Sequence, residues 1–306
     1  MGAGSTPTWP TKVTPRDLKQ DSIDQKDIGA YNSEINTHLQ QLLSDYNNRD
    51  TDRIQTHIDT ILAALSKDEI GNIQLLYGGS IAKHTYVDGL SDIDILGIID
   101  KTELAGKNPE DVLNYFEDLL RRRLPNTDIR KGKLAITIYF SDGCEIQILP
   151  ALKTATGIRI ANPDTQTWSN VVRPDKFATK LTSVNQQNNN GVVPVIKLFK
   201  VIYSEQPKDA QLKGYHIESL AIEAFSNYDG PKTRKAMLMH LTEYASSAVL
   251  SSIKDSTGQS IHVDDYLGEE NSFQRQRMSK AISRIYNQMK IADSEQSFSR
   301  WQDIIS

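Results

Sequence analysis

Two aspartates separated by one residue, Asp92 and Asp94, stand at the start of a strand-like segment of the chain. Alternate residues of a β-strand point to one face, so the two carboxylates lie side by side while Ile93 and Ile95 face a core. Paired carboxylates repel each other, and a fold keeps such a pair most readily where a cation neutralises it. Oxygen ligands of this kind suit Mg²⁺ or Mn²⁺. An isolated pair of this type is more often a solvated strand end, so the residues upstream decide between the two interpretations.

The segment upstream is Gly78-Gly79-Ser80, which follows a candidate strand at residues 73–77. The glycines allow the backbone to approach a ligand closely, and Ser80 is expected to cap a short helix that begins at Ile81. Free N–H groups at a helix start favour an anion such as phosphate. A phosphate-binding loop next to two metal-binding carboxylates favours the functional interpretation of the aspartates.

The chain as a whole divides into three parts. Residues 1–28 contain Gly, Ser, Thr, Pro and scattered charges without a sustained period, and we expect a flexible tail there. Residues 29–175 mix helical and strand periodicity, which predicts a domain of the α+β class with helices at its start. Residues 176–306 show nearly only helical periodicity, which predicts a helical C-terminal domain.

Apolar spacing predicts the individual elements. We expect helices at residues 31–46, 51–65, 109–124, 193–203, 215–225, 233–251 and 271–291, and strands at 73–77, 93–99, 134–140 and 144–149. A turn is expected at residues 141–143, whose sequence is Ser-Asp-Gly, and Pro150 is expected to close the last strand. Helices thus surround the strands on both sides in the sequence.

Composition excludes several classes of function. The 306 residues include one cysteine, Cys144, which allows no internal disulfide and no metal cage of several cysteines. Lys and Arg total 35 against 39 Asp and Glu, so the chain carries no overall basic coat for nucleic acid. No apolar run approaches the roughly 20 residues that cross a bilayer, and the N-terminus lacks the order of a secretory signal. We expect a cytoplasmic protein without a membrane partner.

The Gly-Gly-Ser loop followed by Asp-x-Asp on a strand resembles the nucleotidyltransferases of the polymerase β superfamily. Four segments are similar to its cyclic GMP–AMP synthase and oligoadenylate synthase branch, whose bacterial members are the CD-NTases or SMODS enzymes: Ser91-Asp-Ile-Asp-Ile-Leu96, Glu145-Ile-Gln-Ile-Leu-Pro-Ala151, Ile196-Lys-Leu-Phe-Lys200 and Gly214-Tyr-His-Ile-Glu-Ser-Leu220. The resemblance covers about residues 70–225 and extends loosely to about 290. It implies a sheet domain of polymerase β type, a helical C-terminal domain and a nucleotide-binding cleft between them.

The resemblance assigns the first part of a catalytic site. Gly79 and Ser80 would bind the triphosphate of a donor nucleotide. Asp92 and Asp94 would hold two Mg²⁺ ions, or Mn²⁺ in their place. The match of these residues to the family pattern is close.

The resemblance also assigns residues in the C-terminal half. Lys200 would cover the donor phosphates, and Lys197, three residues earlier on the same helix, is the alternative. Tyr215 would stack on the donor base, a contact worth roughly 1–3 kcal/mol. The family often has serine before this tyrosine, where this chain has Gly214.

The chain departs from the family at its third acid. The family places a carboxylate three residues before the proline of its strand, and Gln147 occupies that position here. A glutamine amide oxygen can contact a metal, but it cannot act as the base that helps to ionise an attacking hydroxyl. Glu145 lies two residues earlier on the same strand face and is the alternative third metal ligand. If Glu145 does not reach the metals, activity is expected to be weak, or the site only binds nucleotide.

The implied activity is metal-dependent joining of nucleoside triphosphates into a cyclic di- or trinucleotide, or a short oligonucleotide, that serves as a second messenger. By resemblance to the bacterial members, the messenger would act in antiphage defence and be read by a separate effector protein. One cysteine cannot build a zinc-containing DNA-sensing insertion, so no double-stranded DNA activator is expected. The alternatives are template-free linear oligonucleotide synthesis, transfer to another acceptor, and a nucleotide-binding pseudoenzyme that acts as a sensor.

Overall fold

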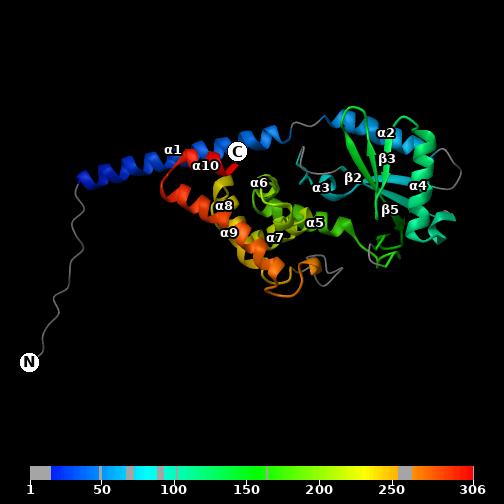
Figure 1. Cartoon of the computed structure of the whole chain (residues 1–306). Coiled ribbons are helices and arrows are strands. Elements are labelled where there is room, and N and C mark those ends of the chain that lie inside the picture. The colour runs from blue at the N-terminus through cyan, green and yellow to red at the C-terminus, as the bar shows by residue number, and fades with distance from the viewer. Residues whose placement is uncertain are drawn as a thin grey trace, which may run out of the picture.

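The computed structural model of the protein describes residues 15–47, 50–66, 72–87, 93–100, 103–162, 165–253 and 264–305. Asp92 and the first half of the expected tail, up to residue 14, lie outside these ranges. The described elements form a half that contains the sheet and a half built of helices, with α1 running along the helical half toward α2 (Figure 1). No described helix combines the length and the apolar character needed to span a membrane.

A mixed sheet forms the framework of the first half. Its strands are β1 (Asn72–Tyr77), β2 (Ile93–Asp100), β3 (Asp128–Lys131), β4 (Ile136–Tyr139), β5 (Glu145–Lys153) and β6 (Ile158–Ile160). The strand order is β1-β2-β5-β4-β3, with β6 paired to β5. The central pair, β2 and β5, is parallel and the other pairs are antiparallel. The register of the central pair places Asp94 opposite Gln147.

One face of this sheet is covered by α2 (Thr51–Ser66) and α4 (Pro109–Arg123), which share a buried apolar cluster with Ile93 and Ile95 of β2. The start of α4 follows from its sequence, because the Asn108 side chain accepts the N–H of Asp111 at 2.8 Å. The alternation of β2 therefore turns Asp94 to the opposite face, as predicted. That face borders the helical half.

The expectation that Pro150 closes its strand is wrong, because β5 continues to Lys153. Pro150 cannot donate a ladder hydrogen bond, and a central strand normally excludes it. On one side of β5, however, β4 pairs with residues 145–148 and β6 pairs with residues 151–153. Pro150 lies in the interval between these two neighbours, so the strand passes through it.

The second half consists of α1 (Pro15–Asp45), α5 (Pro174–Gln187), α6 (Val192–Ser204), α7 (Gly214–Phe225), α8 (Arg234–Ala248), α9 (Phe273–Ser294) and α10 (Phe298–Ile305). Short helical turns occur in both halves. The sheet half contains α3 (Gly79–Ala82) and η1 (Glu103–Gly106), and the helical half contains η2 (Lys208–Ala210) and η3 (Asp265–Leu267). Buried side chains of α1 and α5–α10 form a second apolar cluster, separate from the one under the sheet.

Helix α1 differs from its prediction in length and in the half to which it belongs. It begins at Pro15, so residues 15–28 are helical where we expected a tail. Ile35 and Leu39, one turn apart, are buried in the apolar cluster of the helical half, and the Tyr31 hydroxyl donates to the carbonyl of Ala292 at 2.9 Å. The helix extends beyond this buried stripe into residues 25–30, which are exposed. A segment that buries no face shows no apolar period, which explains why the sequence did not predict it.

Candidate active site

The Gly78-Gly79-Ser80 loop is bonded directly to β2. The N–H of Gly78 donates to the carbonyl oxygen of Asp94 at 2.8 Å, and α3 begins at the next residue. Ser80 is therefore the second residue of α3. The expectation that it caps a helix starting at Ile81 is wrong. Gly78 already has its N–H committed to β2, so the chain turns into the helix earlier than predicted.

Gly79 lies against the carboxyl group of Asp94. Its φ of +48° is in the left-handed region that favours glycine, and a Cβ placed on it would lie 2.9 Å from the Asp94 carboxyl carbon. Any larger residue at this position would thus collide with the acid. Glycine at this position therefore lets the loop pack directly against the Asp94 carboxylate.

The two candidates for the third metal ligand, Gln147 and Glu145, lie on the same face of the sheet as Asp94. In β5, Gln147 is the direct neighbour of Asp94, and Glu145, two residues earlier, is paired with Tyr139 of β4. Within the described residues, no group of three or more His, Cys, Asp or Glu side chains is arranged to hold a metal ion. Asp92 lies outside that part of the chain.

A cavity of about 420 Å³ opens beside Asp94, between the sheet half and the helical half. It is lined by Gly79, Ser80, Lys83, Asp94, Lys200, Tyr203, Ser204, Gln211, Leu212, Gly214, Tyr215, Ile217 and Glu218. Four of the residues that the resemblance assigned to a donor nucleotide, Gly79, Ser80, Lys200 and Tyr215, are in this set. Lys197 is not, and its ammonium group donates to the side chain of Asn47.

Two lysines from different halves of the chain meet one buried glutamate at the cavity wall. Lys83, at the C-terminal end of α3, and Lys200 of α6 both form ion pairs with Glu218 of α7, and the Lys200 Nζ to Glu218 Oε1 distance is 2.9 Å. Lys200 also donates to the carbonyl of Thr85 at 3.1 Å, and the Thr85 hydroxyl donates to Glu218. The Glu218 side chain is 1% exposed. We refer to these four residues as the Glu218 cluster.

The electrostatics of the Glu218 cluster favour an anion in the cavity. Burial alone would raise the pKa of Glu218, but the charges of Lys83 and Lys200 reverse this effect and hold the pKa below its ordinary value. Burial lowers the pKa of Lys200, and the attraction of Glu218 compensates for this only in part. With both lysines protonated, two cations face one anion, and the surplus positive charge suits a phosphate group.

Tyr215 is packed on two sides. Its ring lies 4.4 Å from the ring of Phe177 in α5, and the ammonium group of Lys83 lies 5.2 Å from its centre. A second cavity of about 800 Å³, with a largely apolar lining, shares Gly79, Lys83 and Tyr215 with the first. Lys83 and Tyr215 therefore stand in the wall between the two cavities.

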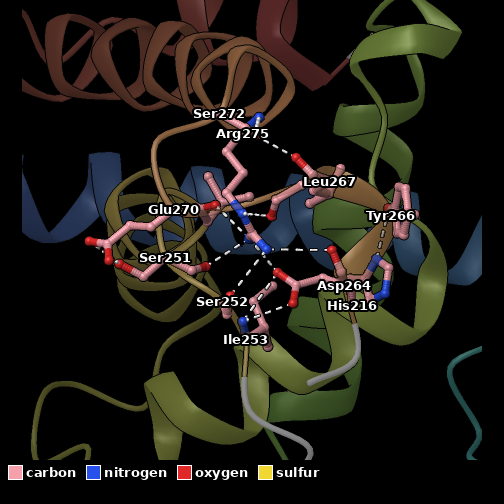
Figure 2. Close-up of polar contacts among 12 residues, drawn as sticks. His216, Ser251, Ser252, Ile253, Asp264, Tyr266, Leu267, Glu270, Ser272 and Arg275 are labelled. Atoms are coloured by element: carbon pink, nitrogen blue, oxygen red, sulfur yellow. Dashed lines mark hydrogen bonds and ion pairs between the residues drawn. The ribbon is translucent and has the colours of Figure 1, made fainter. Parts of the chain in front are cut away.

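A second buried ion pair lies within the helical half (Figure 2). Arg275 of α9 and Asp264 form an ion pair in which both side chains are fully enclosed. Arg275 also donates to the carbonyls of Ser251 at 2.8 Å and Gly268 at 3.0 Å, while Asp264 accepts the N–H of Ile253 at 3.0 Å. We refer to Arg275, Asp264 and these partners as the Arg275 cluster.

The Arg275 cluster is connected to the start of α7 through Tyr266. Tyr266 lies in η3, two positions after Asp264. It stacks on His216 with ring centres 4.9 Å apart and bonds to the His216 Nδ1 at 2.8 Å (Figure 2). His216 directly follows Tyr215, and the ammonium group of Lys213 lies 4.5 Å from the Tyr266 ring centre. The cluster thus supports the turn of α7 that carries the candidate base-stacking tyrosine.

Comparisons with known proteins identify the family of this fold. Residues 34–185 match the profile of the SMODS domain, the Second Messenger Oligonucleotide or Dinucleotide Synthetase domain. The chain belongs to this family. A comparison with curated protein sequences found no match. The SMODS match covers the loop, β2 and β5, so it includes every acidic candidate of the site.

Solved CD-NTase structures share the fold of this SMODS protein. One is CdnC of E. coli MS115-1 with ATP, with a TM-score of 0.63 and 16% identity over 86% of this chain and 91% of that chain. CdnG of Bradyrhizobium diazoefficiens in complex with GTP has a TM-score of 0.67 and 13% identity, over 83% and 88%. DncV of Vibrio cholerae with a linear intermediate has a TM-score of 0.62 and 11% identity, over 95% of this chain and 90% of that chain. The predicted α+β fold of polymerase β type with a helical C-terminal part is confirmed.

Sequence reasoning missed three residues of the Glu218 cluster. Lys83 and Glu218 line the cavity and Thr85 bonds to Glu218, yet none of the three carried an assignment. A usable signal was present for Glu218, because it follows Tyr215 by three positions and therefore shares its helix face. A glutamate in an otherwise apolar helix face needs a buried cation, and two lysines supply it.

Proposed function

We propose that this protein joins nucleoside triphosphates into a cyclic di- or trinucleotide second messenger by metal-dependent nucleotidyl transfer. The observation that carries the proposal is the cavity beside Asp94, which gathers Gly79, Lys200 and Tyr215 around one space. Gly79 comes from the loop, Asp94 from β2, and Lys200 and Tyr215 from two helices of the other half. Each type suits a different part of a nucleoside triphosphate: backbone and ammonium groups for phosphates, and an aromatic ring for the base.

The residues of the chain would divide the work as follows. Lys200 and the loop at Gly79 and Ser80 bind the departing phosphates, which orients the α-phosphate for in-line attack by a ribose hydroxyl. Tyr215 stacks on the donor base. A bond forms between the attacking oxygen and the α-phosphorus while the bond to the bridging oxygen breaks. The hydroxyl proton passes to Glu145 or to water, and pyrophosphate leaves. Repetition within a bound linear product would close the ring.

The donor set of the site fits a divalent metal. Asp94 stands at the cavity wall with the side-chain oxygens of Gln147 and Glu145 on the same sheet face, and oxygen donors suit Mg²⁺ or Mn²⁺. Asp94 and Asp92 would hold the metal, completed by Glu145 or by the Gln147 amide. A bound divalent ion would supply charge neutralisation at the reacting phosphate and lower the pKa of the attacking hydroxyl.

The solved relatives support nucleotide chemistry at such a site. CdnC and CdnG were solved with ATP and GTP, and DncV with the linear intermediate pppA(3′,5′)pG. Family membership also supports a role in antiphage defence, with the product read by a separate effector protein. We include both in the proposal.

A second candidate function is a nucleotide sensor without turnover. It is favoured by the pairing of Asp94 with Gln147, because an amide stands directly beside the acid where related enzymes carry a carboxylate. An amide cannot accept the proton of the attacking hydroxyl. In this case the triphosphate would bind to the cavity and remain intact.

Product analysis distinguishes these functions. The purified protein is incubated with four ribonucleotides, and separately with four deoxynucleotides, in Mg²⁺ or Mn²⁺, and the products are treated with phosphatase and identified by mass spectrometry. A phosphatase-resistant product that is absent with Asp94→Asn supports the synthase, and a ladder of linear products supports oligonucleotide synthesis. Triphosphate binding with no product in the wild type, and product formation by Gln147→Asp, would support the sensor.

A further inference from the structure

The Glu218 cluster buries three charged side chains where the two halves of the protein meet. Lys83 comes from the sheet half, Lys200 and Glu218 come from the helical half, and α3 and α7 are in contact at this point. The lysine side chains are 12% and 9% exposed, and both line the cavity beside Asp94. Glu218 is thus the common partner of two cations that belong to different halves.

Without the glutamate, this arrangement would be unfavourable. Two ammonium groups placed in a poorly hydrated wall repel each other, and each loses hydration energy that only a nearby anion restores. A single carboxylate with two oxygens serves both: one oxygen accepts from Lys83, and the other accepts from Lys200 and Thr85. Glu218 therefore fixes where both positive charges stand relative to Ser80 and Asp94.

We propose that Glu218 is a positioning residue which, through Lys83 and Lys200, aligns the two halves of the protein for binding of the triphosphate group of the donor. This inference rests on the proposed function. It also assigns Lys83 as a second phosphate-binding lysine next to Lys200. Glu218 itself does not contact the donor, because an anion next to the phosphates would repel them; its effect is transmitted by the lysines.

The surroundings of Lys200 agree with this assignment. A Cβ placed on Gly214 would lie 3.4 Å from the Lys200 ammonium group, so the glycine leaves open the space above that charge. The charged groups that face Lys200 are Glu218 from α7, Lys83 from α3 and, at longer range, Asp94 from β2. Burial and Lys83 lower the pKa of Lys200, and the two anions counteract this effect in part.

The test compares binding of triphosphates and monophosphates. Calorimetry measures the dissociation constants of non-hydrolysable analogues of the four nucleoside triphosphates and of the matching nucleoside monophosphates, for the wild type, Glu218→Gln and Lys83→Met. Loss of a charge-assisted contact is expected to weaken triphosphate binding by about tenfold or more in both variants, with less than about threefold change for the monophosphates. A defect in folding would instead weaken both ligand classes equally.

Matched controls come from carboxylate and lysine positions away from the cavity. Glu223→Gln alters a glutamate of the same helix, hydrogen-bonded to Tyr244 at 3.1 Å. Lys235→Met removes a lysine that is equally buried and paired with Asp293 on α9. Lys235→Met is expected to lower thermal stability and leave the ratio of triphosphate to monophosphate affinity as in the wild type.

The outcomes separate the inference from the proposed function. If the wild type prefers triphosphates and Glu218→Gln retains that preference in full, the positioning role is overturned while the proposed function stands. If the wild type binds triphosphates no more tightly than monophosphates, both are overturned. If the double variant of Lys83 and Glu218 loses no more than either single variant, the two residues act as one unit, as proposed; additive losses would contradict it.

Discussion

The Glu218 cluster and the Arg275 cluster both bury a carboxylate against positive charge, and they differ in how completely the charges are satisfied. Arg275 donates to a carboxylate and to several backbone carbonyls, and neither it nor Asp264 has any exposed side-chain surface. Lys83 and Lys200 share one carboxylate and keep part of their surface at the cavity. The first arrangement leaves nothing for a ligand to bind, whereas the second leaves unused positive charge.

This difference teaches how to distinguish structural from functional buried charge. A rigid guanidinium with five donors can be saturated by carbonyls, so Arg suits the role of joining chain segments. A lysine ammonium is a compact charge whose position depends on its neighbours, and it can exchange one anion for another. We therefore expect variants of the Arg275 cluster to affect folding and variants of the Glu218 cluster to affect binding.

The largest effect is expected from Arg275→Met. The change leaves Asp264 buried without its cation, which costs about 3–5 kcal/mol of unfolding free energy. Denaturant unfolding followed by circular dichroism measures this loss. The molecules that remain folded should bind triphosphate nearly as the wild type does. A change in unfolding free energy below about 1 kcal/mol would show that Asp264 regains water and that the enclosure is incomplete.

The opposite behaviour is expected from Lys200→Met. Lys83 still pairs with Glu218 after this replacement, so the loss of unfolding free energy is expected to be smaller than for Arg275→Met. Loss of one charged contact should weaken triphosphate binding by about 10- to 100-fold. Calorimetry and denaturant unfolding of the same sample provide both quantities. Equal binding by wild type and variant would break the distinction between the two clusters.

A smaller effect concerns pH. The pKa of Lys200 is lowered from 10.5 by burial, and only its protonated form attracts phosphate. Triphosphate affinity should therefore fall as pH rises through this lowered pKa, at a pH below the range of an ordinary lysine. The fall in triphosphate affinity is measured with a non-hydrolysable analogue between neutral and alkaline pH. It should disappear in Lys200→Met; its persistence there would assign it to another group.

The smallest effect is expected from Tyr266→Phe. The change removes the hydroxyl bonded to His216 but keeps the stacked ring, so about 1 kcal/mol of unfolding free energy is lost. Donor affinity should stay within about threefold of the wild type because the backbone of α7 keeps its place. Thermal unfolding and calorimetry measure the two effects. A larger loss of affinity would mean that the Arg275 cluster also controls Tyr215.

The sequence predicts the part of the site that is local in the chain. Gly79, Ser80 and Asp94 lie within a short segment, so strand alternation and loop chemistry were sufficient to bring them together. The face of Asp94 was predicted correctly for the same reason. Most helices of the C-terminal half were also predicted, because long amphipathic segments carry a strong period.

Long-range partners were beyond the reach of such reasoning. Glu218 acquires its role from Lys83, 135 positions away in the chain, and no local pattern connects them. The strands β3 and β6 have four and three residues, too few to show an alternation. The position of α1 depended on which half could accept its apolar stripe, and that is a property of the other helices.

Pro150 has a consequence for the precision of the site. It occupies the interval between β4 and β6, where a strand can lack a donor. A slip of β5 by one residue would move the proline into a paired position and would turn Gln147 and Glu145 to the opposite face of the sheet. The proline thereby disfavours the slip that would place it opposite β6. A residue with no role in the chemistry thus helps to set the register in which β5 pairs with the strand that carries Asp94.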